Sequence, residues 1–204
     1  MYRIFIALLF INFCYSQSYY VYVAAESDDT VSVLKFDGDN FEETDKVTVG
    51  IMPTENEGPH GITIDPSGKY WYLTLAHGSP NGSLVKYSTE NNEPLSKVEL
   101  GLFPATMQIS PKTGLLYAAN FNLHGLMRTS TVSVVDPENM VEITKIKTGI
   151  MPHGSRISID GTTHYSVAMM SGELFEIDAL DLSVKRILSL DNNSNYRNAM
   201  HHSR

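Results

Sequence analysis

Short apolar runs recur along the chain and are separated by turns rich in Gly, Pro, Asn, Asp and Ser. Apolar and polar side chains alternate within Ser83–Ser88, Thr131–Asp136 and Glu173–Asp178, whereas Tyr70–Leu75 is almost continuously apolar. Short runs that contain β-branched and aromatic residues are typical of β-strands. Because no stretch shows the 3.6-residue apolar period of an amphipathic helix, the pattern predicts an all-β protein.

A segment that contains Pro and Gly is repeated along the chain. Gly58–Tyr70 has the same pattern as Met151–Tyr165, and Phe103–Gly114 is a third copy. The prolines near the start of these copies are separated by 45 and 48 residues. Each copy opens with one predicted strand and is followed by three more. Four strands at a period in the forties are typical of a β-propeller blade, whereas a β-sandwich would not repeat and a β-solenoid has a much shorter period.

The repeat predicts a β-propeller of four-stranded blades, with about four blades present. We place these blades at about residues 18–50, 58–101, 103–149 and 151–191. The first blade contains the predicted strands Tyr20–Ala25, Thr30–Phe36 and Lys46–Val49, and it lacks an opening strand. The aromatic side chains expected to pack between neighbouring blades are Trp71, Tyr72, Tyr117 and Tyr165.

The end of the sequence bears on whether the ring is complete. Met200–Arg204 resembles Met151–Arg156, so we expect a fifth blade to begin at about residues 199–204. An incomplete propeller follows from this reading. The alternative is a four-bladed propeller whose last strand is Tyr196–His202, although that segment is polar and poor in β-branched residues.

The repeated segments also resemble a known family. Pro59–Ile62 with Asp65–Lys69, and Leu115–Asn120 with Thr131–Asp136, resemble the repeats of YVTN-type β-propeller proteins. The resemblance covers roughly residues 18–190. It implies a propeller that has about seven blades when complete, but it implies no single activity, because such propellers serve many functions.

The first 16 residues have the pattern of a secretory signal peptide. Arg3 supplies a positive charge, Ile4–Phe13 is almost wholly apolar, and small residues precede the expected cleavage before Gln17. The apolar run is shorter than the roughly 20 residues that a membrane-spanning helix needs. We therefore expect an exported protein, periplasmic or extracellular, whose mature chain (17–204) has no transmembrane segment. A lipoprotein signal with Cys14 as the acylated residue is the alternative.

Composition excludes several classes of protein. A hydrophobic content of 42% with 19% charged residues excludes an intrinsically disordered chain. The formal net charge of −8 argues against nucleic acid as a partner, because binding phosphates requires a basic surface. With one cysteine in the sequence, neither an intramolecular disulfide nor a cysteine-cluster zinc site can form.

Propeller topology is expected to bring five of the seven histidines to one face. The first strand of each blade lines the central channel, and it starts on the same face as the loop between strands two and three. His60, His153 and His202 stand at starts of first strands. His77 and His124 lie in unusually long loops between strands two and three.

Imidazole suits zinc or copper, and imidazole with thioether suits copper. His60 and His153 occupy equivalent repeat positions and are the first candidates for metal ligands, with His77, His124 and His202 as further candidates. Methionines are expected nearby: Met52, Met151, Met169, Met170 and Met200. The Pro-His-Gly sequence at His60 and His153 also resembles that of the propeller domain of nitrous-oxide reductase, which implies copper held by channel-facing histidines.

A structural role for the same histidines is the alternative. Pro and Gly shape a bend, and a histidine within it can bond a neighbouring backbone carbonyl. The third copy has Ala105 at the equivalent position, which argues against a ring of ligands. His164 is expected on the opposite face of the propeller.

Two classes of function remain open. The leading hypothesis is an exported, non-catalytic propeller that binds a protein partner or small ligand on its loop-rich face and needs no cofactor. The alternative is a protein that handles copper or zinc, or an enzyme that uses the channel-mouth histidines. Propeller lactonases and streptogramin lyases resemble the general repeat, and a channel-facing histidine suits general-base catalysis.

Overall fold

The computed structural model describes residues 18–50, 55–77 and 81–190. The expected signal peptide, the expected start of a fifth blade, His202, Met52 and Met200 lie outside these ranges. No helix among the described residues is long and apolar enough to cross a membrane.

The described residues form 15 strands in four antiparallel sheets. The first sheet contains β1 (Tyr19–Ala25), β2 (Thr30–Phe36) and β3 (Phe41–Thr48). The second contains β4 (Pro59–Ile64), β5 (Tyr70–Leu75), β6 (Ser83–Ser88) and β7 (Pro94–Glu99). The third contains β8 (Pro104–Ile109), β9 (Leu116–Asn120), β10 (Thr129–Asp136) and β11 (Val141–Ile150). The fourth contains β12 (Pro152–Ile157), β13 (Thr163–Ala168), β14 (Glu173–Asp178) and β15 (Ser183–Ser189).

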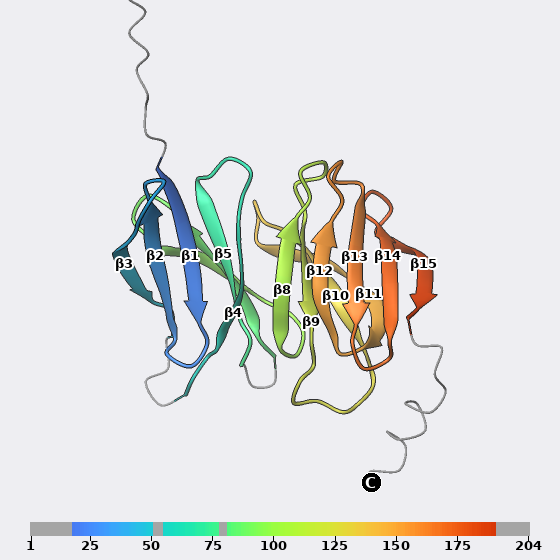
Figure 1. The fold of residues 1–204 in the computed structure, drawn as a ribbon. Coiled ribbons are helices and arrows are strands. Elements are labelled where there is room, and N and C mark those ends of the chain that lie inside the picture. The colour runs from blue at the N-terminus through green and yellow to red at the C-terminus, as the bar shows by residue number, and fades with distance from the viewer. Residues whose placement is uncertain (1–17, 51–54, 78–80, 191–204) are drawn as a thin grey trace, which may run out of the picture.

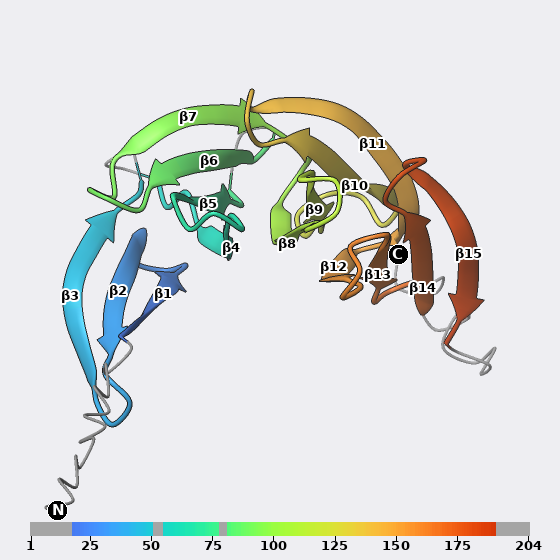
Figure 2. The same ribbon diagram turned by 90° about the horizontal axis from the view of Figure 1, so that it is seen from above.

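The four sheets stand side by side around one axis (Figure 1). Seen from above, they form an open arc in which β4, β8 and β12 lie on the inner side and β3, β7, β11 and β15 lie on the outer side (Figure 2). The sheets are therefore the blades of a propeller, numbered 1 to 4 in chain order. The prediction of an all-β propeller with four-stranded blades and a three-stranded first blade is confirmed.

Strand β3 begins earlier than its sequence indicates. The predicted strand covered Lys46–Val49, whereas β3 already begins at Phe41. Phe41 pairs with Phe36 of β2, and the two rings stack with centroids 4.6 Å apart. The polar residues that follow Phe41 are exposed on an outer strand, so no apolar pattern marks them.

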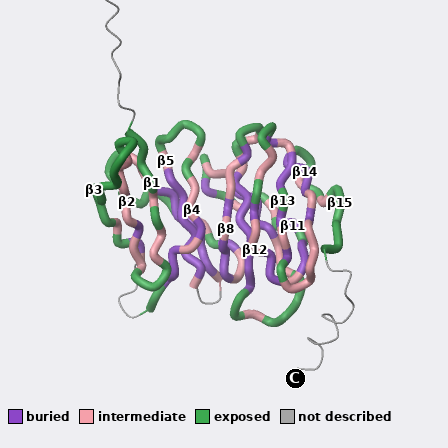
Figure 3. Tube along the Cα trace, viewed as in Figure 1, coloured by how far each residue is buried: buried purple, intermediate pink, exposed green. Residues whose placement is uncertain are grey.

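The hydrophobic core lies between the blades (Figure 3). In β5, Trp71 packs with the blade 1 residue Val31, whereas the next residue, Tyr72, packs with Leu116 of blade 3. Tyr117 is also fully buried, between blades 3 and 4. Tyr165 is 36% exposed, on the side of blade 4 away from blade 3, where the described residues hold no neighbouring blade, so its packing between blades stays a prediction.

Polar contacts hold the inner strands at a fixed spacing. Thr74 accepts a hydrogen bond from the Gly61 amide at 2.7 Å and donates one to the Ala105 carbonyl at 2.9 Å, so its hydroxyl joins blades 2 and 3. Between blades 3 and 4, Gln108 accepts a hydrogen bond from the Ile157 amide at 2.7 Å. These contacts satisfy polar groups that the core would otherwise leave unpaired.

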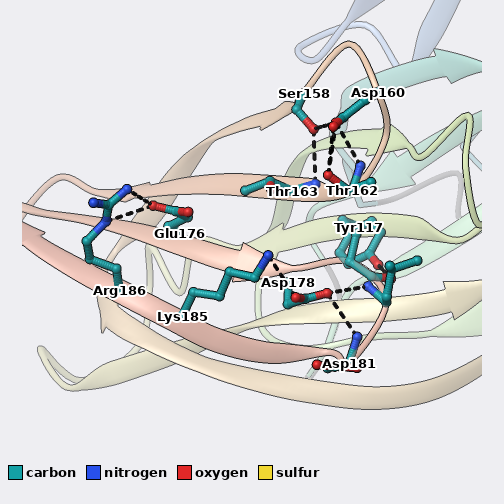
Figure 4. Close-up of polar contacts among 12 residues, drawn as sticks. Tyr117, Ser158, Asp160, Thr162, Thr163, Glu176, Asp178, Asp181, Lys185 and Arg186 are labelled. Carbon is teal, nitrogen blue, oxygen red and sulfur yellow. Dashed lines mark hydrogen bonds and ion pairs between the residues drawn. The ribbon is translucent and has the colours of Figure 1, made fainter.

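Aspartates end several strands by bonding the backbone of the following turn. In blade 4, Asp160 accepts hydrogen bonds from Ser158 and Thr162, and Asp178 accepts them from the amides of Leu180 and Asp181 (Figure 4). The Asp178 carboxylate also contacts Lys185 Nζ at 2.8 Å. The side-chain hydrogen bond from Lys185 and these amide bonds lower the pKa of Asp178 to about 2.

Candidate functional site

The residue before each inner strand has a left-handed backbone. Gly58, Phe103 and Met151 have φ values of 62°, 53° and 56°, and each precedes the first proline of its blade. The carbonyl of each accepts a hydrogen bond from the residue just after the second strand, at 2.8–3.1 Å. This conformation costs a non-glycine residue on the order of 1 kcal/mol. Phe103 and Met151 adopt it nevertheless, so the bend is imposed by the blade.

Rings gather where these bends meet the loops between second and third strands. We call the group the histidine cluster, and it consists of His60, His77, His124, His153, Phe103 and Phe121. Phe103 lies at its centre, with ring centroids 5.0 Å from His77, 5.6 Å from His60 and 5.6 Å from His124. Phe121 lies 4.8 Å from His153. The structure thus brings together the four sequence-predicted histidines that it describes.

Within the cluster, His60 and His153 contact each other directly. They open β4 and β12, and their ring centroids are 5.3 Å apart with an interplanar angle of 70°. Blade 3 stands between these two strands and has Ala105 at the equivalent position. Blade 3 therefore contributes no histidine to this contact, although its inner strand lies between the other two.

The environment favours the neutral form of His60. Burial lowers the pKa of His60, the nearby Glu26 carboxylate opposes this effect, and the imidazoles of His153 and His77 lower the pKa further. At neutral pH the ring is consequently uncharged and keeps a nitrogen lone pair that can accept a proton. Glu26 itself contacts His77, with Oε1 3.2 Å from Nε2.

Blade 1 fixes the loop that precedes β4. Asp29 accepts hydrogen bonds from the amides of Glu57 and Gly58, each at 2.9 Å. A Cβ atom on Gly58 would lie 1.9 Å from Cδ2 of His77. A glycine at this position therefore provides both the positive φ and the space for the His77 ring.

Comparison with known protein families identifies a family for this chain. Residues 11–145 match the family described as lactonase, 7-bladed β-propeller, which covers well over half of the chain. The chain belongs to this lactonase family. The resemblance to propeller repeats is thereby supported at the level of the propeller family. The finer assignment to YVTN-type repeats stays a prediction.

Solved structures resemble this member of the lactonase family in fold. Hydrazine synthase of Kuenenia stuttgartiensis has a TM-score of 0.63 and 20% identity, over 81% of this chain and 47% of its own. A putative 6-phosphogluconolactonase of Bacteroides uniformis has a TM-score of 0.66 and 20% identity, over 84% and 52%. A protein of unknown function from Desulfotomaculum acetoxidans has a TM-score of 0.67 and 12% identity, over 90% and 59%.

The chain thus spans about half the length of these solved structures. Identities this low establish the common fold alone. No curated protein sequence matches the chain.

His164 occupies a different place from the one predicted. It is fully buried between blades 3 and 4 rather than on an open face of the propeller. Its ring stacks on Tyr117 at 4.9 Å, and its Nε2 is 2.7 Å from Ser155 Oγ. Burial lowers the pKa of His164 to about 3. Side chains alternate between the two faces of β13, and this alternation directs the His164 ring into the interface between blades 3 and 4. His164 is therefore a core residue.

For metal binding, the part of the chain that the structure describes contains no group of three or more His, Cys, Asp or Glu side chains placed to hold an ion. The assignment of His60 and His153 as metal ligands remains a prediction. What the described site offers is a pair of imidazole rings beside aromatic rings, with the neutral form of His60 favoured by burial, which suits proton transfer.

Sequence reasoning missed the residues that surround the histidines of this lactonase-family chain. Phe103, Phe121, Glu26 and Asp29 all shape the cluster, but no sequence motif marks any of them as part of a site. One signal was available for Phe103. It stands before the proline of its repeat, at the position that holds glycine in the second blade.

Proposed function

We propose that this chain hydrolyses lactones, with His60 as general base and His153 as its partner. The observation that carries the proposal is the contact between these two rings, 5.3 Å apart, on the inner strands of a lactonase-family propeller. The lowered pKa of His60 supports it, because a general base must be unprotonated at the working pH. The putative 6-phosphogluconolactonase among the structural relatives is consistent with this reaction class.

The reaction can be written with atoms in balance. Neutral His60 accepts a proton from a water molecule as the water oxygen bonds to the lactone carbonyl carbon. The bond between that carbon and the ring oxygen then breaks. His60 then gives this proton to the leaving alkoxide, with the His153 ring beside it, which restores neutral His60 and yields a hydroxy acid. The aromatic rings of Phe103 and Phe121 limit water around the pair, which strengthens polar interactions there.

This role fits the loop-rich face better than binding alone. A non-catalytic propeller would equally well present loops to a partner, but the family match supports hydrolysis. The small ligand expected on this face is then a cyclic ester. Copper or zinc handling receives no comparable support from the described side chains.

Hydrolysis of glucono-δ-lactone and γ-butyrolactone in a pH-stat tests the proposal. We expect His60→Gln and His153→Gln each to lower kcat/KM by roughly 100-fold, the usual contribution of a general acid or base. Lys112→Gln, in the turn after β8, is the control and should leave the rate unchanged. In the unmodified chain, kcat/KM should rise with increasing pH and should level off at a pH below 6.5, because the pKa of His60 is lowered. His60→Gln should remove this pH dependence. Absence of turnover, or equal rates in all variants, would refute the proposal.

We also propose that the protein is exported after cleavage before Gln17. The charged, apolar and small-residue pattern of residues 1–16 supports this, although these residues lie outside the described structure. N-terminal sequencing of protein from cell fractions tests it. An intact Met1 on cytoplasmic protein would contradict export.

A further inference from the structure

A cleft lined mostly by polar residues lies between blades 2 and 3, next to the histidine cluster. Its volume is about 490 Å³, and apart from Leu102 it is lined by Asn81, Asn122, Arg128, Thr129, Ser130 and Thr131. Asn81 precedes β6, and Arg128 precedes β10. Both residues precede the third strand of their blade, so they lie at the same end of the blades. The cleft therefore opens on the loop-rich face.

The lining offers hydrogen-bond donors. Thr131 Oγ1 accepts a hydrogen bond from Asn120 Nδ2 at 2.8 Å, which leaves the threonine proton to be donated elsewhere. Thr129 is exposed beside it. Among the described residues, no carboxylate pairs with the exposed Arg128 guanidinium. In a chain of net charge −8, a positive group amid hydroxyls and amides is a local reversal of charge.

We propose that this cleft binds an oxyanion, held by Arg128 and the hydroxyls of Thr129 and Thr131. A guanidinium binds planar or tetrahedral oxyanions through two parallel N–H donors, and these charge-assisted bonds are stronger than neutral ones. This site stands independently of lactone hydrolysis, and its test requires no turnover.

Glu99 sets the charge at the margin of the cleft. Its Oε1 accepts a hydrogen bond from Asn81 Nδ2 at 2.9 Å, so one lining residue touches a carboxylate. This negative charge weakens the attraction for an anion. Removing the charge without changing the shape of the side chain therefore strengthens oxyanion binding, the opposite of the effect expected from removing Arg128.

Titration with inorganic phosphate, followed by amide NMR at constant ionic strength, tests the proposal. We expect saturable shifts at Thr129–Thr131. Arg128→Gln should raise the dissociation constant by roughly tenfold, the value of one charge-assisted hydrogen bond, and Glu99→Gln should lower it. Arg186→Gln removes the same charge on the outer strand β15, where Arg186 is paired with Glu176, and should leave the dissociation constant unchanged.

Parallel titrations with sulfate and acetate distinguish tetrahedral from planar oxyanions, and saturable binding of any of the three supports the site. Glucose serves as the neutral probe. Shifts that do not saturate, or equal affinities in Arg128→Gln and Arg186→Gln, would overturn the proposal. Glucose binding that survives Arg128→Gln would also overturn it, in favour of a neutral polyol site. Because Arg128 is exposed, its variant should keep a dispersed amide spectrum.

Discussion

The Lys86 ammonium lies over the Tyr70 ring, with Nζ 4.1 Å from the ring centroid. The same Nζ donates a hydrogen bond to the Pro137 carbonyl at 2.9 Å. Lys86 and Tyr70 belong to blade 2, whereas Pro137 follows β10 of blade 3. A buried lysine thus contacts an aromatic ring of its own blade and joins that blade to blade 3 through one backbone carbonyl.

Replacing this lysine tests how strongly it joins the blades. Lys86→Met keeps an apolar stem but removes the cation–π contact and the shorter hydrogen bond to the Pro137 carbonyl, which then keeps only the 3.5 Å bond from the Tyr72 hydroxyl. We expect the free energy of unfolding to fall by about 2 kcal/mol. Lys97→Met, on the exposed strand β7, is the control and should change stability little. Equal urea midpoints for the two variants would show that the contact contributes nothing measurable.

The threonine that joins the inner strands gives a second test. Thr74→Val keeps the shape of the side chain but leaves the Gly61 amide and the Ala105 carbonyl without their partner in the core. We expect a loss of about 1–3 kcal/mol, the usual cost of unpaired buried polar groups. Thr48→Val makes the same change at an exposed position of β3. Calorimetry should show a lower melting temperature for Thr74→Val alone.

The fold was largely predictable from the sequence because its signals are local. The repeated Pro-Gly segments and the alternating strands determine the blade, and they are visible without any tertiary contact. The first part of β3 was missed because the residues after Phe41 are polar and exposed. Their strand is formed by pairing with β2, which no pattern within the segment reveals.

The site was predictable in position but not in detail. Topology alone places His60, His77, His124 and His153 on one face, and the structure brings their rings together. The direct contact of His60 with His153 joins the inner strands of blades 2 and 4, which do not follow one another along the chain. Long-range contacts of this kind follow from the packing of blades and not from spacing along the chain.

The burial of His164 makes stability depend on pH. Burial lowers its pKa in the folded protein to about 3, whereas an unfolded chain has a value near 6.5. Between these two pH values the unfolded state binds one more proton. Stability is therefore fully present above pH 6.5 and falls with decreasing pH, by about 1.4 kcal/mol per unit from this group.

His164→Gln should remove this contribution. Urea unfolding at several pH values from 7 to 5 measures it, and the variant should show a smaller slope than the unmodified chain, even though it is less stable at pH 7. Leu123→Gln is the control, because Leu123 is exposed and carries no titratable group, so the slope should stay unchanged. Identical slopes for His164→Gln and the unmodified chain would contradict the assignment of this pH dependence to the buried ring.

Gly58 and Gly114 separate backbone strain from the contact with His77. Both have positive φ, 62° and 73°, so alanine at either position carries a similar conformational cost, about 1 kcal/mol. A Cβ atom meets nothing within 4 Å at Gly114 but lies 1.9 Å from the His77 ring at Gly58. Gly58→Ala should therefore destabilise the chain more than Gly114→Ala and should displace His77 from Glu26. Combining Gly58→Ala with His77→Ala should remove the excess, because the obstructing ring is gone. If the excess remained in the double variant, the clash would lie with the backbone, and Gly58 would not be the residue that makes space for His77.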